Sequence, residues 1–357
     1  MKMIFRWFPN GDDSVTLSQI RQIPGMTGVA SCMPHIPVGE VWPRDEIFAM
    51  RDEIAASGLE MEVIESVNIH EDIKKGLPSR DRLIDNYIKT VKYLHEAGVK
   101  CICYNFMPVM DWARSTLNYP LEDGSTALGY EHETVLKMNP NSLADNLHSG
   151  SSGYSLPGWE PERFPAMAAD IEFYRTMSVD DYWKNIKYFL DAIVPYAEMY
   201  DMNFAIHPDD PPWPLYGLPK VITGVETMRK FLSLNESKRN GLTFCTGSLA
   251  ANPANDIPAM AKEFASQGRI HFAHLRNIKH TSEKDFHESA HLSQCGDLDM
   301  YAIVKALYDA GFDGYIRPDH GRSIWGEVSR PGYGLYDRAL GSVYLHGLWE
   351  AIGKNSK

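Results

Sequence analysis

Residues 203–207 read NFAIH, and three further runs of the same kind follow: LTFC at 242–245, IHFAH at 270–274 and GYIRPD at 314–319. Each run is short and apolar, as buried strands are, and each ends on a residue that binds divalent metals. These residues are His207, Cys245, His274 and Asp319. Because segments long enough for helices separate the runs, we expect one metal held at the mouth of a parallel β-barrel.

The same pattern extends along the whole chain of 357 residues. Eight strand-like runs recur, at residues 3–8, 28–33, 61–65, 100–106, 203–207, 242–246, 270–275 and 315–319. Amphipathic helical patterns lie in most of the intervals, for example RDEIFAMRDEIAASG at 44–58. Eight such alternations predict a (β/α)8 (TIM) barrel that forms a single catalytic domain over residues 1–357. The competitor, a doubly wound open sheet, often has a glycine-rich phosphate turn after its first strand, and RWFPNG is no such turn.

One long insertion interrupts the alternation after the fourth strand, at residues 107–180. It contains LADNLHSGSSGYSLPGWEPERF, which is rich in Gly, Ser and Pro. An excursion of this length in a compact domain is typical either of a bland or disordered insertion or of a functional cover. Its aromatic residues favour an ordered lid: Trp112, Tyr119, Tyr154 and Trp159.

Composition and charge exclude several classes of protein. The formal net charge of −12 argues against a nucleic-acid surface, which needs clustered Lys and Arg. No stretch approaches the 18 or more apolar residues of a membrane span, and Arg6 interrupts the apolar start of the chain, so we expect neither a membrane segment nor a signal peptide. The five cysteines are odd in number and form no CxxC pair, which indicates a reduced, cytoplasmic protein.

The interpretation of the four strand-end residues as a metal site depends on the barrel. A single His or Cys at a strand end is more often a satisfied core residue, whereas four on successive predicted strands favour a shared function. Imidazole, thiolate and carboxylate all bind divalent cations, and a catalytic site keeps one position open for water or substrate. No short spacing motif defines this site by itself.

The segment RPDHGR at 317–322 places a second titratable group beside Asp319. In an extended strand Asp319 and His320 point to opposite sides, so both serve one site only if the chain turns, and Gly321 permits that turn. His320 is then a candidate general acid or base. Tyr333, in the tight loop RPGYG at 330–334, is a candidate proton donor at the same rim. A structural role is the alternative for each.

Taken in order, the longer motifs resemble one known family, mannonate dehydratase. These motifs are RWFP at 6–9, YNFMPVMDW at 104–112, IHPDDPP at 206–212, FCTGS at 244–248, FAHLRN at 272–277, RPDHGR at 317–322 and PGYGLYDRALG at 331–341. The resemblance covers essentially the whole chain. It implies a xylose-isomerase-like TIM barrel that removes water from D-mannonate, giving 2-keto-3-deoxy-D-gluconate, in hexuronate (glucuronate) catabolism.

Matched motif by motif, the resemblance implies the metal ligands His207, Cys245, His274 and Asp319 and the acid–base pair His320 and Tyr333. Dehydration of a sugar acid requires one group to take the C2 proton and another to protonate the departing C3 hydroxyl, while a metal stabilises the developing charge. We expect His320 to be the base and Tyr333 the acid, with the reverse assignment open. The softness of a Cys ligand by itself suggests Zn²⁺, whereas the resemblance suggests Mn²⁺, with Fe²⁺ or Co²⁺ as alternatives. We predict Mn²⁺.

The sequence also suggests which residues bind the substrate and how the chain assembles. The candidates for binding the hydroxyls and carboxylate of the substrate are Arg6, Asn105, Arg276 and Asn277. A metal-dependent sugar isomerase of the same superfamily would rely on more carboxylates and often two metals, and a non-catalytic sugar-acid binding protein would have no use for the His320 and Tyr333 pair. A metal-dependent endonuclease would need a basic groove. We expect a homodimer, with YLHGLW at 344–349 either at the interface or in the last barrel helix.

Overall fold

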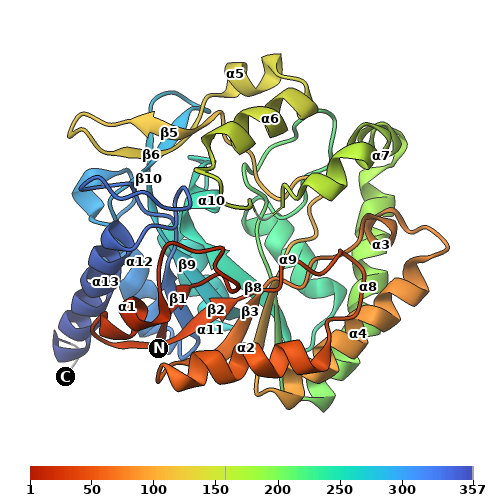
Figure 1. The fold of residues 1–357 in the computed structure, drawn as a ribbon, viewed down its shortest axis with the longest axis horizontal. Helices are drawn as coiled ribbons and strands as arrows, with labels where there is room; N and C mark the ends of the chain where they lie inside the picture. Colours follow the sequence, from red (N-terminus) through yellow and green to blue (C-terminus); the bar gives the residue numbers. More distant parts are fainter. Residues whose placement is uncertain (157, 356–357) are drawn as a thin grey trace.

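The computed structural model of the chain describes residues 1–156 and 158–355. Eight parallel strands close into a barrel, and each pairs with the next barrel strand along the chain until the last pairs with the first (Figure 1). They are β1 (Lys2–Arg6), β2 (Met26–Ser31), β3 (Glu60–Glu65), β4 (Cys101–Tyr104), β7 (Asn203–Ile206), β8 (Asn240–Cys245), β9 (Ile270–Leu275) and β12 (Tyr315–Pro318). The predicted (β/α)8 barrel is confirmed, and each of the eight predicted runs overlaps one barrel strand, although β1, β2, β3 and β8 begin one or two residues earlier than predicted.

Helices follow the strands and cover the outside of the barrel. They are α1 (Leu17–Gln22), α2 (Arg44–Ala56), α3 (Glu71–Lys75), α4 (Arg80–Glu96), α8 (Val179–Met199), α9 (Val225–Leu234), α10 (Thr246–Ala250), α11 (Ile257–Ser266), α12 (Met300–Asp309) and α13 (Tyr336–Asn355). In α4 the buried residues recur every three or four positions, as in Leu83, Tyr87, Val91 and Leu94. That spacing places them on one face, which packs against the barrel.

Two hydrophobic clusters lie on the two faces of the barrel wall. The larger one fills the layer between strands and helices. The smaller one takes one or two residues from most of the strands and fills the barrel interior: Ile4, Ala30, Val63, Cys101, Cys103, Ala205, Phe272 and Tyr315. Cys101 and Cys103 lie in this same interior cluster, as residues two apart on a strand must. The interior is therefore a packed core, and only its carboxyl end is left for polar groups.

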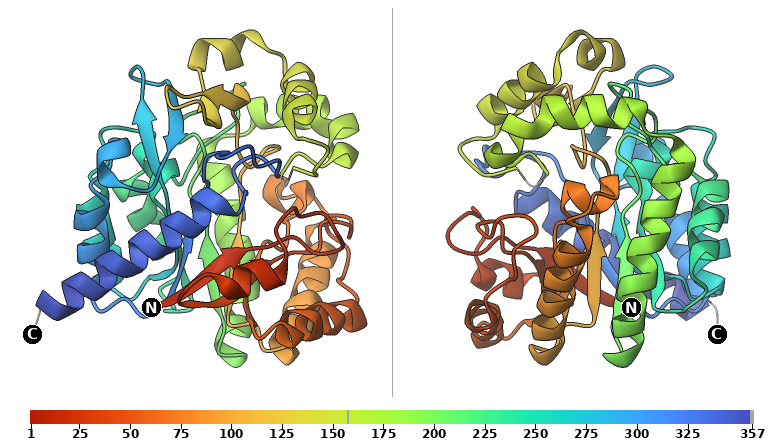
Figure 2. Two further views of the ribbon diagram at one scale, coloured as in Figure 1. Left: turned by 60° about the vertical axis from the view of Figure 1, so that its left-hand side comes forward. Right: turned by 90° about the vertical axis from the view of Figure 1, so that its right-hand side faces the viewer.

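The insertion of residues 107–180 is folded. It contains β5 (Thr116–Pro120), β6 (Thr126–Tyr130), α5 (His132–Lys137), α6 (Pro140–Gly150), the 3₁₀ helix η1 (Pro161–Arg163), α7 (Phe164–Thr176) and the start of α8. Figures 1 and 2 show α5 and α6 gathered at one end of the barrel. Side chains from the insertion line the same cavity as strand-end residues, so the insertion covers the carboxyl ends of the strands.

A second insertion, between β9 and α12, pairs with the first. It forms β10 (Asn277–His280) and β11 (Phe286–Ser289), followed by the 3₁₀ helix η2 (Ser293–Cys295). Together the two insertions build an antiparallel sheet in the order β10-β11-β6-β5, which we call the added sheet. The sequence patterns had not predicted β10, β11 or this sheet.

Among the helices of the described residues, none combines the length and apolar character that crossing a membrane requires.

Candidate active site

The predicted site residues converge on one cavity at the carboxyl ends of the barrel strands. Seven of the ten line it: Arg6, Asn105, His207, Arg276, Asp319, His320 and Tyr333. The insertion contributes Asp111, Trp112, Leu128 and Leu156 to the same walls. Cys245 and His274 are fully buried and adjoin these residues, whereas Asn277 does not line the cavity. One face of the cavity is thus made by strand ends and the other by the cover.

Three of the four predicted metal ligands form a tight cluster. One ligand atom each from His207, Cys245 and His274 lies within 4.8 Å of the other two. The fourth is adjacent, because Asp319 Oδ2 lies 3.4 Å from Cys245 Sγ. The register of the parallel strands explains the convergence, since Cys245 pairs with His274 across β8 and β9, and Arg317 pairs with His274 across β9 and β12.

The protonation of this cluster favours a cation. Although burial opposes it, the Arg276 guanidinium and His207 hold the pKa of the Cys245 thiol well below its usual value, so the sulfur is a thiolate. Burial likewise opposes the charged form of His207, yet the neighbouring Cys245 raises the pKa of His207 to about 9. His207 Nδ1 donates to the Pro208 carbonyl at 2.7 Å, which leaves Nε2 for the cluster. A divalent cation would take the place of the proton that His207 and Cys245 share.

Buried polar atoms in the described residues also fit a missing ligand. His274 Nε2 and Glu65 Oε2 are both buried without a hydrogen-bond partner, 3.5 Å apart. The other ring nitrogen of His274, Nδ1, lies 3.3 Å from Arg317 Nη2. A cation between His207, Cys245 and His274 would satisfy these orphaned atoms, because buried donors and acceptors are costly when unpaired. The donor set of two imidazoles, a thiolate and a carboxylate therefore fits a divalent metal.

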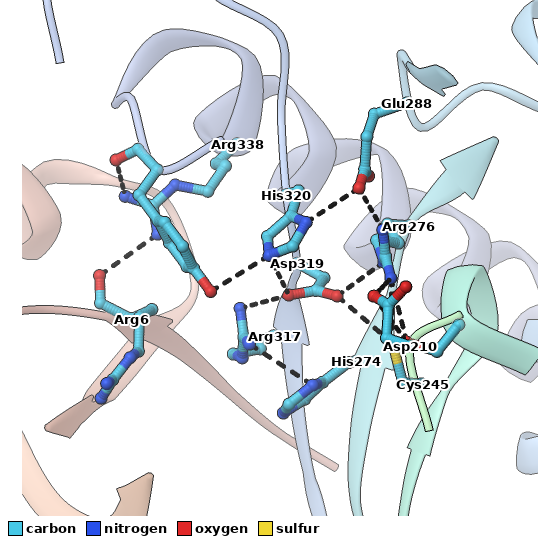
Figure 3. A network of polar contacts seen from close by, with 12 residues as sticks. Arg6, Asp210, Cys245, His274, Arg276, Glu288, Arg317, Asp319, His320 and Arg338 are labelled. Carbon is cyan, nitrogen blue, oxygen red and sulfur yellow. Dashed lines mark hydrogen bonds and ion pairs between the residues drawn. The ribbon is translucent and has the colours of Figure 1, made fainter. Parts of the chain in front are cut away.

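Asp319 is held in position by two arginines. Its Oδ1 lies 2.7 Å from Arg317 Nη1, and its Oδ2 lies 2.9 Å from Arg276 Nε (Figure 3). Burial alone would favour the neutral acid, but Arg317, His320 and Arg276 hold the pKa of Asp319 well below its usual value. Asp319 is thus an ionised carboxylate beside the His–Cys–His cluster.

The predicted acid–base residues contact each other directly. His320 Nε2 lies 3.1 Å from the Tyr333 hydroxyl, and the two rings meet edge to face. Burial raises the pKa of Tyr333 to about 12 in spite of the nearby Arg317 guanidinium, so the phenol keeps its proton at neutral pH. The expected turn of the chain after β12 is present, and both Asp319 and His320 reach the cavity.

Behind this pair lies a buried ionic network. Arg114 binds Asp210 through two contacts of 2.7 and 2.9 Å. Arg276 binds Asp210 at 2.9 Å and also contacts Glu288. Glu288 in turn lies 2.9 Å from His320 Nδ1. Arg114 precedes β5, Asp210 follows β7, Arg276 follows β9 and Glu288 lies on β11, so the network connects the barrel rim to the added sheet.

The four predicted substrate-binding residues separate into different environments. Arg6 donates to the Ala30 carbonyl, at 3.3 Å, and to Cys32, and it stacks on Phe8. It forms no ion pair within the described residues. The other cavity arginines, Arg276, Arg317 and Arg330, each contact carboxylates. Arg6 therefore carries the least compensated positive charge at the cavity wall.

The two predicted asparagines also lie in different environments. Asn105 follows β4 and lines the cavity. Asn277 donates from its amide to the Leu292 carbonyl and accepts from the Leu298 backbone, so it braces the second insertion. Its assigned role in substrate binding stays a prediction, without a cavity contact to support it.

Several residues of the site were not predicted. Glu65 is the last residue of the predicted strand at 61–65, and Asp210 lies in the IHPDDPP motif, but neither was assigned to the site. Arg114 and Glu288 carry no strand-end signal, because they lie in the two insertions whose pairing the sequence patterns did not indicate. Glu288 could have been found by recognising that residues 277–289 form a hairpin.

Comparisons with known proteins agree with this geometry. Residues 1–357 match the family described as D-mannonate dehydratase (UxuA). The chain is 52% identical over 357 residues to mannonate dehydratase of Thermotoga maritima, covering 100% of this chain and 99% of that protein. The crystal structure of mannonate dehydratase from Streptococcus suis serotype 2 superposes with a TM-score of 0.91 at 45% identity, covering 100% of this chain and 96% of that one.

A more distant structural likeness concerns the fold alone. A xylose isomerase domain protein from Planctomyces limnophilus matches with a TM-score of 0.57 at 13% identity, over 99% of this chain and 98% of that one. This likeness supports the (β/α)8 barrel fold. Motifs, cavity and full-length similarity point the same way, and the chain belongs to the D-mannonate dehydratase family.

Proposed function

We propose that this enzyme removes water from D-mannonate and gives 2-keto-3-deoxy-D-gluconate, as part of hexuronate catabolism. The observation that carries the proposal is the placement of the His320 and Tyr333 pair beside the His–Cys–His cluster, in a chain similar to named mannonate dehydratases over its whole length. A binding protein would not need an imidazole and a phenol 3.1 Å apart at the cavity wall.

The proposed metal ligands are His207, Cys245, His274 and Asp319. The proposed metal is Mn²⁺, with Fe²⁺ or Co²⁺ as the alternatives to it, and these three are preferred to Zn²⁺. When bound, such a cation would act as a Lewis acid that stabilises negative charge developing on the substrate carboxylate. The ionised states of Cys245 and Asp319 support this assignment.

Different residues of the chain would then carry out the separate steps of the reaction. Arg6 binds the substrate carboxylate, because it is the cavity guanidinium without an ion pair among the described residues. His320 takes the C2 proton at Nε2, and Tyr333 donates a proton to the C3 hydroxyl, which leaves as water. The two groups are 3.1 Å apart, so they can address neighbouring carbons of one substrate. The enol that results becomes the 2-keto acid by tautomerisation.

The cover supports this chemistry by excluding water. Trp112, Leu128 and Leu156 of the insertion face the strand-end groups across the cavity. An enclosed, low-dielectric site strengthens the interactions between charges and protects the enol from side reactions.

Incubation of purified enzyme with D-mannonate tests the proposal. Protein stripped of metal is reconstituted with Mn²⁺, Fe²⁺, Co²⁺ or Zn²⁺, and a 2-keto-3-deoxy acid is measured over time, with D-altronate as the control substrate. We expect product from D-mannonate with Mn²⁺. A ketose formed without loss of water would establish an isomerase, and binding without turnover would establish a sugar-acid binding protein.

We also propose that the enzyme is a cytoplasmic homodimer. The five cysteines are free, and a reducing compartment keeps the Cys245 thiolate available. An apolar patch joins the loop before α13 to α13 itself: Trp325, Val328, Leu340 and Val343 are 48–75% exposed. Contiguous exposed apolar surface is typical of an interface, and a second copy of the chain would cover it through a twofold axis. Light scattering of wild type and Trp325→Ser tests this, with a dimer and a monomer as the expected results.

A further inference from the structure

We propose that Glu288 is a positioning residue for the dehydration: it holds His320 in the tautomer that presents an unprotonated Nε2 to the substrate. Glu288 lies on β11 of the added sheet, far in sequence from the strand ends that provide the other groups. The inference rests on the proposed function of the site, and one of its two readouts does not require turnover.

The hydrogen bonds assign the tautomer. Glu288 Oε1 lies 2.9 Å from His320 Nδ1. An ionised carboxylate can only accept, so Nδ1 must carry the hydrogen. In a neutral imidazole the other nitrogen is then an acceptor, and His320 Nε2 accepts from the Tyr333 hydroxyl at 3.1 Å. A chain of donors therefore runs from Tyr333 through His320 to Glu288.

The surroundings of Glu288 keep it ionised. Its side chain is completely buried, which opposes charge, but Arg276 contacts it (Figure 3). Arg114 Nη2 also lies 3.1 Å from Oε1. Burial is outweighed by Arg276 and His320, and these groups lower the pKa of Glu288 to about 2. At neutral pH the carboxylate is thus an acceptor in a fixed place.

The added sheet fixes that place. β11 is an inner strand, paired with β10 on one side and β6 on the other, and Glu288 faces Ile278 in the register with β10. β10 begins two residues after the end of β9, so the sheet is tied directly to the barrel wall. A side chain on such a strand is held more precisely than one on a free loop, as orientation of a catalytic imidazole requires.

The competing explanation is that Glu288 only neutralises Arg114 and Arg276. Glu288→Asp separates the two roles, because it keeps the charge but withdraws the carboxylate from His320 by about 1.5 Å, the length of one C–C bond. Ser289→Ala is the matched control. Ser289 is the next residue on β11 and is also buried, and its hydroxyl donates to the Ala290 carbonyl, away from His320.

The first readout is steady-state kinetics with D-mannonate on Mn²⁺-loaded enzyme of verified metal content. For Glu288→Asp we expect kcat to fall about 100-fold, as for loss of a well-placed acid–base group, with KM changed less than about threefold. Ser289→Ala should keep the kcat of the wild type. If Glu288→Asp keeps kcat within about twofold, or if KM rises while kcat is unchanged, the positioning role is wrong.

The second readout is the ¹H–¹⁵N spectrum of protein labelled with [¹⁵N]histidine and loaded with diamagnetic Zn²⁺. The signals of His320 are identified by their absence in His320→Asn. We expect the pattern of an Nδ1-protonated ring in the wild type and a shift toward the Nε2-protonated ring in Glu288→Asp. Identical patterns in both proteins would overturn the inference, even if D-mannonate is not the substrate.

If Glu288→Asp does not fold, a second variant, Glu288→Gln, still tests the proposal. Glu288→Gln preserves the length of the side chain but has no charge to hold Nδ1 protonated, so we expect the same fall in kcat and the same spectral shift. Wild-type kinetics or an unchanged tautomer in Glu288→Gln would again contradict the proposal. Absence of turnover in the wild type would count against the proposed function alone, because the spectrum still reports on Glu288.

Discussion

The ends of strands β7, β8 and β9 and the added sheet meet at one cavity, yet they hold different kinds of group. The strand ends carry His207, Cys245 and His274, whose ligand atoms face one another. The added sheet and its neighbouring loop carry Arg114 and Glu288, which are fully buried and bind charged partners. The barrel thus supplies groups for binding and reaction, whereas the insertions supply groups that hold them in place.

The difference shows how a common barrel acquires a particular chemistry. Strand ends of any such barrel bring side chains to the same rim. Orientation of a side chain that follows a strand, such as His320, needs support from beyond the rim, and here two insertions combine to provide it. Variants at the rim should therefore change catalysis or metal binding, and variants in the added sheet should change stability and positioning.

Among the variants, His320→Asn at the rim should have the largest effect, which is on kcat. Loss of the base should lower kcat about 1000-fold, equivalent to about 4 kcal/mol, with metal content unchanged. The control is His346→Asn on α13, a half-buried residue outside the cavity whose ring lies 3.3 Å from the Gly25 carbonyl. Undiminished turnover by a metal-loaded His320→Asn enzyme would remove this residue from the mechanism.

Arg114→Met should give the largest loss of stability in the network behind the rim. The variant leaves Asp210 and Glu288 with one guanidinium fewer in a fully buried site, which should cost about 3–4 kcal/mol in the free energy of unfolding. Urea denaturation measures it. Arg239→Met, at the exposed pair with Asp201, should cost less than about 1 kcal/mol. Equal losses of unfolding free energy in both variants would show that the buried ion pairs stabilise the protein no more than an exposed pair does.

Glu288 should make the stability of the protein depend on pH. Its folded-state pKa of about 2 lies below the ordinary value of 4.5, so its stabilising contribution is present above about pH 4.5 and is lost as the pH falls toward 2. The difference in unfolding free energy between wild type and Glu288→Gln should shrink by roughly 3 kcal/mol over that range. A difference that stays constant with pH would mean that Glu288 is not ionised in the folded protein.

Cys245→Ser should act through the metal, and its direct effect is on the affinity for the metal. Replacing a thiolate ligand by a hydroxyl should weaken metal binding by more than about tenfold, since loss of even an outer partner of a ligand costs that much. Titration calorimetry on stripped protein measures it, and Cys295→Ser at the exposed cysteine is the control. Unchanged affinity in Cys245→Ser would exclude the sulfur as a ligand.

The contrast between rim and added sheet also explains what the sequence could predict. Runs such as IHFAH mark a buried strand and its polar end together, so the eight strands and the gathered His207, Cys245, His274 and Asp319 followed from local patterns. Residues 277–289 include a polar stretch, KHTSEKD, that gives no strand signal of its own. β11 forms because β6 and β10 lie on either side of it, and pairing between two distant insertions leaves no trace in local periodicity. For that reason Glu288 and Arg114 were missed.

The fate of the third carbon of the substrate tests the central claim most directly. D-Mannonate labelled with ¹³C at C2 and C3 is incubated with the Mn²⁺-loaded enzyme and followed by NMR. The account predicts that C3 changes from a hydroxyl-bearing carbon to a methylene while C2 becomes a ketone, and that His320→Asn suppresses both changes together. A product that keeps the C3 hydroxyl, or a substrate that stays unchanged, would contradict it.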